Sequence, residues 1–153
     1  MGRVHVQAHG SFPPDVFVRA LTDFGPGRSE VFGNNAAADL RVHDRGDTWA
    51  EVTEGSTSGG VWQRTRYDWS TPGQVLIDVV DSNAFGPGSR WLYRVAPAQD
   101  GGTDIDLRIR RVPNTTKGRL LDRLLSLGAG HVFFTRDLRH TVRTLESRLS
   151  PAP

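Results

Sequence analysis

The chain has 153 residues, of which 37% are hydrophobic and 24% are charged, a balance that fits one folded domain and excludes wholesale disorder. It has no cysteine, which excludes disulfides and thiolate metal sites, and no apolar run near the roughly 20 residues of a transmembrane helix. The formal net charge is only +2, and acidic and basic residues interleave between Asp104 and Arg111, which argues against a nucleic-acid partner because such partners need a basic face with few acids.

The first third of the chain predicts one strand and two short helices. Residues 3–11 alternate apolar and polar side chains, which is typical of a half-buried strand. Residues 16–21 place apolar side chains at helical spacing, and the Gly-Pro-Gly sequence at 25–27 ends that helix. Residues 28–33 can form a second short helix before a turn at 33–35.

The middle of the chain predicts six further strands, separated by turns rich in Gly, Asp, Ser and Pro, including one at residues 55–60. The strands are expected at residues 40–43, 48–54, 61–70, 74–81, 89–97 and 103–112. The last of them has the clearest alternation, with Ile105, Leu107 and Ile109 on one face and charged side chains on the other. One face must therefore be buried and the other exposed to water.

The C-terminal part predicts one long amphipathic helix over residues 117–149, followed by a frayed tail at 151–153. Its apolar stripe is expected to comprise Leu121, Leu125, Gly128, Val132, Val142, Leu145 and Leu149, widened by Leu124, Leu127, Phe134 and Leu138. Gly128 and Gly130 weaken its middle and allow a kink there. The sheet is the only apolar surface that such a helix can cover.

Four segments carry a resemblance to a known family: residues 12–17, 61–69, 102–107 and 117–121. Together with the element order, they resemble the START-like, birch-pollen-allergen-like superfamily (SRPBCC), and most closely its polyketide cyclase/dehydrase and lipid-transport branch. The resemblance implies an α+β helix-grip fold, with a curved seven-stranded antiparallel sheet wrapped around the C-terminal helix and two short helices after the first strand. One domain would then span residues 1–150. The superfamily has no universal catalytic motif, so the fold does not assign chemistry.

A bent sheet cannot touch a straight helix along its whole length, so this fold predicts a cavity lined by inward side chains. In residues 61–70 the inward face is ambiguous, because Trp62 lies opposite Tyr67 and Trp69, and we take the latter two as inward. The predicted ligand-binding residues are Tyr67, Trp69, Ile77, Val79, Phe85, Trp91, Tyr93, Ile105, Leu107, His131, Phe134 and Leu138.

Each of these residues also has a purely structural interpretation. The aromatic side chains could simply fill the core, and His131 could be a satisfied interior histidine instead of a polar anchor or an acid/base group. Phe85 could be a lid over the cavity mouth or the tip of a turn that packs on its neighbour.

Three functions remain open. The first is binding of a hydrophobic or aromatic small molecule such as a lipid, polyketide or isoprenoid. The second is a polyketide aromatase/cyclase or dehydratase, whose acid/base groups would come from His131, Tyr93, Tyr67 or Asp78. Two or more titratable groups in hydrogen-bond reach inside the cavity would favour this enzyme.

The third function is a protein-interaction module that uses the arginine-rich sheet face, where Arg64, Arg66, Arg90, Arg94, Arg108 and Arg110 are expected. These arginines more readily pair with aspartates on neighbouring strands. We expect no cofactor, no metal and no integral membrane segment. The start of the chain has no signal-peptide pattern, so we expect a cytoplasmic monomer or homodimer.

Overall fold

The structure, a computed structural model, describes residues 2–56 and 60–149. Part of the turn expected at 55–60 and the whole tail expected at 151–153 lie outside these residues. The strands are β1 (Gly2–Gly10), β2 (Asn35–Arg45), β3 (Trp49–Ser56), β4 (Trp62–Asp68), β5 (Gln74–Ser82), β6 (Arg90–Pro97) and β7 (Thr103–Arg111). The helices are α1 (Pro14–Leu21), α2 (Arg28–Val31), α3 (Thr116–Leu124), the π-helical segment η1 (Leu125–Ala129) and α4 (Gly130–Leu149).

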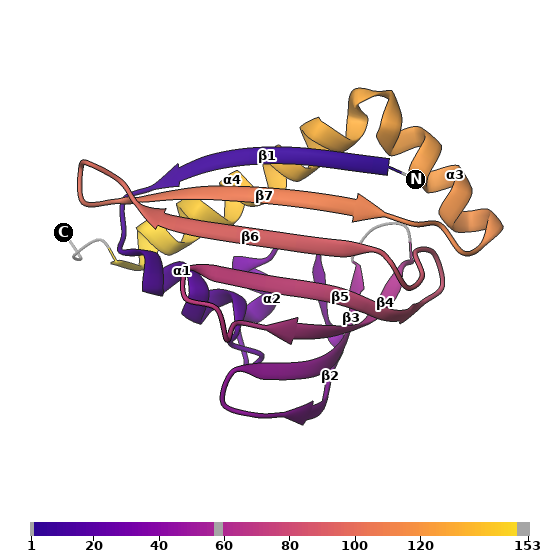
Figure 1. Cartoon of the computed structure of the whole chain (residues 1–153), viewed down its shortest axis with the longest axis horizontal. Coiled ribbons are helices and arrows are strands. Elements are labelled where there is room, and N and C mark those ends of the chain that lie inside the picture. Colours follow the sequence, from indigo (N-terminus) through magenta and orange to yellow (C-terminus); the bar gives the residue numbers. More distant parts are fainter. Residues whose placement is uncertain (1, 57–59, 150–153) are drawn as a thin grey trace.

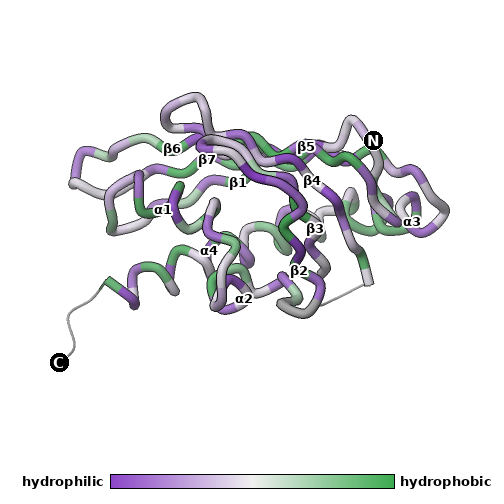
Figure 2. The backbone as a smooth tube through the Cα atoms, turned by 90° about the horizontal axis from the view of Figure 1, so that it is seen from below, coloured by the Kyte–Doolittle hydropathy of each residue, from purple (hydrophilic) through white to green (hydrophobic). Residues whose placement is uncertain are grey.

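The strands form one antiparallel sheet in the order β1-β7-β6-β5-β4-β3-β2. β1 closes onto β7, where Val4 pairs with Ile109 and Val6 with Leu107, so the apolar side chains of both strands share a face. The sheet curls over α4, and α1, α2 and α4 lie on its concave side (Figures 1 and 2). The predicted α+β helix-grip architecture is confirmed.

Strand β2 is longer than the sequence indicated. The Gly-Asn-Asn sequence at 33–35 favours a turn, but Asn35 already pairs with Ser56 of β3. Register shifts interrupt the β2–β3 ladder, and such bulges bend and twist a strand. The bulges contribute to the curl at this edge of the sheet. They also interrupt the alternation of apolar and polar side chains from which the length of β2 is predicted.

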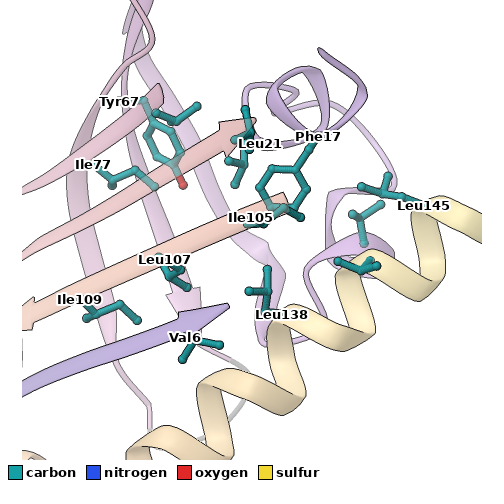
Figure 3. Close-up of a cluster of buried hydrophobic side chains, with 14 of the residues drawn as sticks. Val6, Phe17, Leu21, Tyr67, Ile77, Ile105, Leu107, Ile109, Leu138 and Leu145 are labelled. Carbon is teal, nitrogen blue, oxygen red and sulfur yellow. The ribbon is translucent and has the colours of Figure 1, made fainter. Parts of the chain in front are cut away.

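The core lies between the concave face of the sheet and the helices. Ile105, Leu107 and Ile109 are each at most 3% exposed, as the alternation of β7 predicts. Figure 3 shows Leu138 of α4 pointing toward the side chains of the sheet, and Leu145 on the side of Phe17 of α1. The core residues belong to one contiguous cluster, so sheet and helix share a single interior.

The C-terminal helix has the expected extent but is interrupted where the glycines predicted a kink. Gly128 has a φ of 92°, in the left-handed region, and Leu127 also departs from helical geometry. The two halves meet at a bend beyond β1 (Figure 1). The interruption breaks the predicted apolar stripe, because Leu124, Leu127 and Val132 are more than half exposed. No helix among the described residues is long and apolar enough to cross a membrane.

Helix α2 is held against α4 by polar contacts. The Thr141 hydroxyl donates to the carbonyl oxygen of Val31 at 2.9 Å, and Arg148 pairs with Glu30 at 2.8 Å. These contacts fix the position of Arg28, the first residue of α2, at the edge of the interior.

Candidate functional site

A cavity of about 410 Å³ lies between the concave face of the sheet and the helices α2, α3 and α4. The predicted residues that line it are Tyr67, Ile77, Phe85, Trp91, Tyr93, Leu107, Phe134 and Leu138. They come from β4, β5, β6, β7, α4 and the loop after β5. Their role in ligand binding stays a prediction. Alternation along β4, β5, β6 and β7 accounts for the inward position of the five that lie on strands.

On β4 the structure resolves the ambiguity of the inward face. Tyr67 is 4% exposed and points inward, whereas Trp62 is 39% exposed. In Figure 3 the hydroxyl of Tyr67 points away from its strand, toward the interior of the protein. Thr65, two residues earlier on the same face, also lines the cavity.

Three predicted residues are inside the protein or at its edge but do not line the cavity. Trp69 lies beyond the end of β4 and packs on the margin of the core. Ile105 belongs to the same core cluster as Phe17 of α1, which fills that end of the interior. Val79 is buried in phase with Val75 and Ile77, and the alternation fails only after it, where Val80 is 44% exposed beside a register shift between β4 and β5.

His131 does not line the cavity, and its predicted inward position is wrong. Its side chain is exposed, and its ring nitrogen Nδ1 lies 3.5 Å from the hydroxyl of Thr135. The helical spacing that placed it inward was counted through η1 and the left-handed Gly128. Those residues change the direction of the helix, so the stripe before them does not continue after them.

Asp78 also lies outside the cavity, on the convex face of the sheet. It forms a two-contact ion pair with Arg90 across β5 and β6, at 2.6 and 3.0 Å. Arg64 of β4 forms an ion pair with Glu51 of β3 through a single contact at 2.9 Å. Among the described residues, Arg90 alone of the six arginines makes the expected pair with an aspartate on a neighbouring strand, whereas Arg108 pairs with Asp106 of its own strand. The expected charge lattice is therefore only partly formed.

Phe85 is buried, with 5% of its surface exposed, and lines the cavity. Its backbone forms an isolated β-bridge with Pro113, just before α3. The residue is therefore a packed part of the cavity wall in this structure. A lid role stays a prediction.

The main polar feature of the cavity is a buried network that we call the Arg28 cluster, made of Arg28, Asn35, Glu54 and Tyr67. Arg28 is 6% exposed, and its Nε donates to Glu54 at 2.6 Å. Its Nη2 donates to the Tyr67 hydroxyl at 3.0 Å, and that hydroxyl donates to the other Glu54 oxygen at 2.5 Å. The Asn35 amide donates to Glu54 at 2.7 Å.

The remaining donors of Arg28 are also occupied. Its Nη1 donates to the carbonyl oxygens of Leu21 and Asp23 at 2.9 and 2.8 Å. The guanidinium carbon lies 4.6 Å from the ring centre of Phe24 and 4.7 Å from that of Phe32, distances typical of cation–π contacts. Arg28 is thus fixed in place, and its charge is balanced by Glu54.

Besides Arg28, whose pKa is lowered by burial but raised overall by Tyr67 and Glu54, three titratable groups on the cavity wall have raised pKa values. Burial raises the pKa of Tyr67 well above its ordinary value of 10.0, and the charge of Glu54 raises it further. Burial and the charge of Asp137 raise the pKa of Tyr93. Burial also raises the pKa of the Asp137 carboxyl, an effect that nearby His140 opposes. Both phenols are therefore neutral proton donors at physiological pH.

Stability is expected to fall steeply above about pH 10. A pKa raised in the folded state means that the unfolded chain loses its phenolic protons first, so the stabilisation is complete below pH 10.0 and is lost above it. The loss is up to about 1.4 kcal/mol per pH unit for each tyrosine. The chain has only two tyrosines, so urea unfolding from about pH 9 to about pH 11 measures both directly.

The matched variant is Tyr93→Phe, which removes one of the two contributions and is expected to halve the slope. Equal stability at both ends of this pH range would contradict the raised pKa values.

Arg28, Asn35, Glu54 and Asp137 were not predicted from the sequence. Glu54 follows Ala50 and Val52 on the inward face of β3, so alternation alone would have found it. Arg28 gave no such signal, since it lies at the start of a four-residue helix.

Solved structures share this fold at low sequence identity. Protein TTHA0849 from Thermus thermophilus superposes with a TM-score of 0.78 at 14% identity, covering 97% of this chain and 99% of that chain. The Zhui aromatase/cyclase from a Streptomyces species gives 0.77 at 13% identity, covering 97% and 95%. A START superfamily protein from Mycobacterium smegmatis gives 0.70 at 12% identity, covering 97% of each chain.

No family model and no curated protein sequence matches the chain. At these identities the structural similarity establishes the fold, and the chemistry has to be argued from the cavity.

Proposed function

Because the chain has the helix-grip fold of START-like proteins, we propose that it binds an apolar or aromatic small molecule, such as a lipid, polyketide or isoprenoid, between the sheet and α4. The observation that carries this proposal is the cavity of about 410 Å³, a volume within the range of about 300–1,000 Å³ that is usual for small-molecule sites. Ile77, Leu107 and Leu138 give it apolar walls.

The Arg28 cluster supports a ligand with a hydrogen-bonding group at one end. Within the described ranges, the Oδ1 atom of Asn35 and the hydroxyl of Thr65 are buried without a hydrogen-bond partner. Both residues line the cavity, next to the cluster. Buried polar atoms of this kind are normally satisfied. A hydroxyl on the ligand would donate to Asn35 and accept from Thr65.

Binding is expected to fail when the cavity is filled from α3. Leu121 lines the cavity, so Leu121→Trp places an indole in the space of the ligand. The uncharged fluorescent probe N-phenyl-1-naphthylamine is expected to bind the wild type and to bind this variant at least about tenfold more weakly, because overpacking costs about 1–3 kcal/mol. Fluorescence titration gives both affinities.

The matched control is Leu120→Trp, which changes the preceding residue on the same helix. Leu120 is 61% exposed and does not line the cavity, so its variant should bind the probe like the wild type. Equal weakening by both substitutions would argue against binding inside the cavity.

A second candidate, a polyketide cyclase or dehydratase, is favoured by one observation. Arg28, Glu54 and Tyr67 are titratable groups in mutual hydrogen-bond contact on the cavity wall, the arrangement that acid/base catalysis needs. In such a step the Tyr67 hydroxyl would break its hydrogen bond to Glu54 and give its single proton to a carbonyl oxygen of a polyketide, while Nη2 of Arg28 donates to the phenolate oxygen that remains. Incubation with a synthetic tetraketide thioester and mass spectrometry decides: a cyclised or dehydrated product supports an enzyme, and unchanged substrate leaves binding as the function.

A further inference from the structure

Arg111, the last residue of β7, points into the interior. It continues the inward stripe of Ile105, Leu107 and Ile109, and it is 1% exposed. It also lines the cavity. An arginine so fully buried normally has every donor group paired.

The hydrogen bonds of Arg111 are incomplete. Its Nε donates to Asp122 of α3 at 3.1 Å, whereas Nη1 and Nη2 are buried without a partner anywhere in residues 2–56 and 60–149. Arg28 differs, because its Nε, Nη1 and Nη2 all donate to protein oxygens. The two arginines therefore have different roles: Arg28 holds the wall together, and Arg111 keeps its outer donors unpaired.

The guanidinium of Arg111 is held in a fixed position. Asp122 anchors it from α3, and the ring centre of Phe134 on α4 lies 6.0 Å from its Cζ atom. On β1, Gly2 leaves it room, because a Cβ atom there would overlap Nη2. Fixing the side chain in advance lowers the entropy lost when its free donors bind a ligand.

The position of Arg111 also separates it from the Arg28 cluster. In the sheet, β5 and β6 lie between β7, which carries Arg111, and β4, which carries Tyr67. Three strand spacings correspond to roughly 14 Å along the sheet. The unpaired donors of Arg111 and the Arg28 cluster therefore lie at separate places on the cavity wall.

We propose that Nη1 and Nη2 of Arg111 bind a carboxylate, and that the ligand of the cavity is an apolar carboxylic acid. The proposal rests on the proposed function, since it names the class of molecule that the cavity binds. The paired N–H groups of a guanidinium match the two oxygens of a carboxylate, and charge-assisted bonds of this kind are the strong ones. Asp137 also lines the cavity, and burial raises the pKa of its carboxyl.

The test compares two probes with the same ring system, 2-naphthoate and 2-naphthalenemethanol, by isothermal titration calorimetry near neutral pH. The wild type is expected to bind the carboxylate at least about tenfold more tightly than the alcohol. Arg111→Met should remove this preference and keep the affinity for the alcohol. Arg111→Lys should give an intermediate preference, since it keeps the charge but loses the fork of donors.

The matched control is Arg108→Met, which removes an exposed, outward-facing arginine from the same strand and should leave the preference unchanged. Equal affinity of the wild type for both probes overturns the carboxylate site, while the proposed binding function stands. The same conclusion follows if Arg111→Lys, or a folded Arg111→Met, keeps the full preference. Failure of the wild type to bind either probe counts against both proposals.

Discussion

Replacing Glu54 by alanine is expected to lower the free energy of unfolding by about 3–5 kcal/mol, because the substitution leaves the charge of a buried arginine without its partner. Arg28 is 6% exposed, and Glu54 is the carboxylate that accepts from its Nε. The substitution also removes the acceptor of the Tyr67 hydroxyl and of the Asn35 amide. Urea denaturation followed by tryptophan fluorescence measures the loss.

A double-mutant cycle separates the charge effect from the loss of packing. In an Arg28→Met background, Glu54→Ala is expected to cost only about 1 kcal/mol or less, because no buried charge remains to be left alone. Glu51→Ala is the matched control on the same strand, since its partner Arg64 is 42% exposed and such pairs contribute less than about 1 kcal/mol. If Glu54→Ala alone has only a small effect on stability, then water or a local rearrangement compensates the charge that Arg28 is left with.

The alternation of the strands predicted most of the cavity wall. Period two is robust in β7, because Ile105, Leu107 and Ile109 alternate with charged residues and the strand pairs without a break on both sides. The same parity correctly placed Tyr67 and Tyr93 on the inward face. Where a register shift intervenes, parity no longer decides which side chains face inward, since Val80 and Asp81, the two residues after Val79, are both exposed.

The polar part of the site was missed for a different reason. Glu54 and Arg111 lie on the same inward stripes as their apolar neighbours, but charged residues were assumed to face water. That assumption fails where a buried charge has a partner from another element, here Arg28 of α2 and Asp122 of α3. These partners are 26 and 11 residues away in sequence, so only the fold reveals the pairs.

The helix shows the corresponding limit of period 3.6. Leu138, Val142 and Leu145 are buried as predicted, all within the regular part of α4. Leu124, Leu127, His131 and Val132 lie within or close to the η1 segment, and all are exposed. A periodic pattern therefore predicts a buried face only within an uninterrupted helix and away from its end, since Leu149, the last residue of α4, is also 52% exposed. The two glycines signalled the interruption but not the rotation that it produces.

Substitution of Gly118 by alanine is expected to destabilise the protein by about 2–3 kcal/mol, as a clash at a closely packed site. Gly118 is in the first turn of α3, where its N–H donates to the capping hydroxyl of Thr115 at 3.0 Å. A Cβ atom at this position would overlap the backbone carbonyl of Ala84. That carbonyl accepts from the N–H of Asn114 at 3.0 Å, so it cannot move away without breaking a hydrogen bond.

The expected loss already includes the higher helix propensity of alanine, which favours the variant by about 1 kcal/mol. The matched control is Gly25→Ala, where the nearest atom to a Cβ is the Asp23 carboxylate oxygen at 3.1 Å, which has to shift by only a few tenths of an ångström and can keep its hydrogen bond from the Gly25 N–H. This control should change stability by less than about 0.5 kcal/mol in thermal or urea unfolding. Because Ala84 precedes the cavity residue Phe85, the clash should also weaken binding of N-phenyl-1-naphthylamine. A Gly118→Ala protein as stable as the wild type would show that α3 is not seated against this loop, and that the cavity is more open at this end.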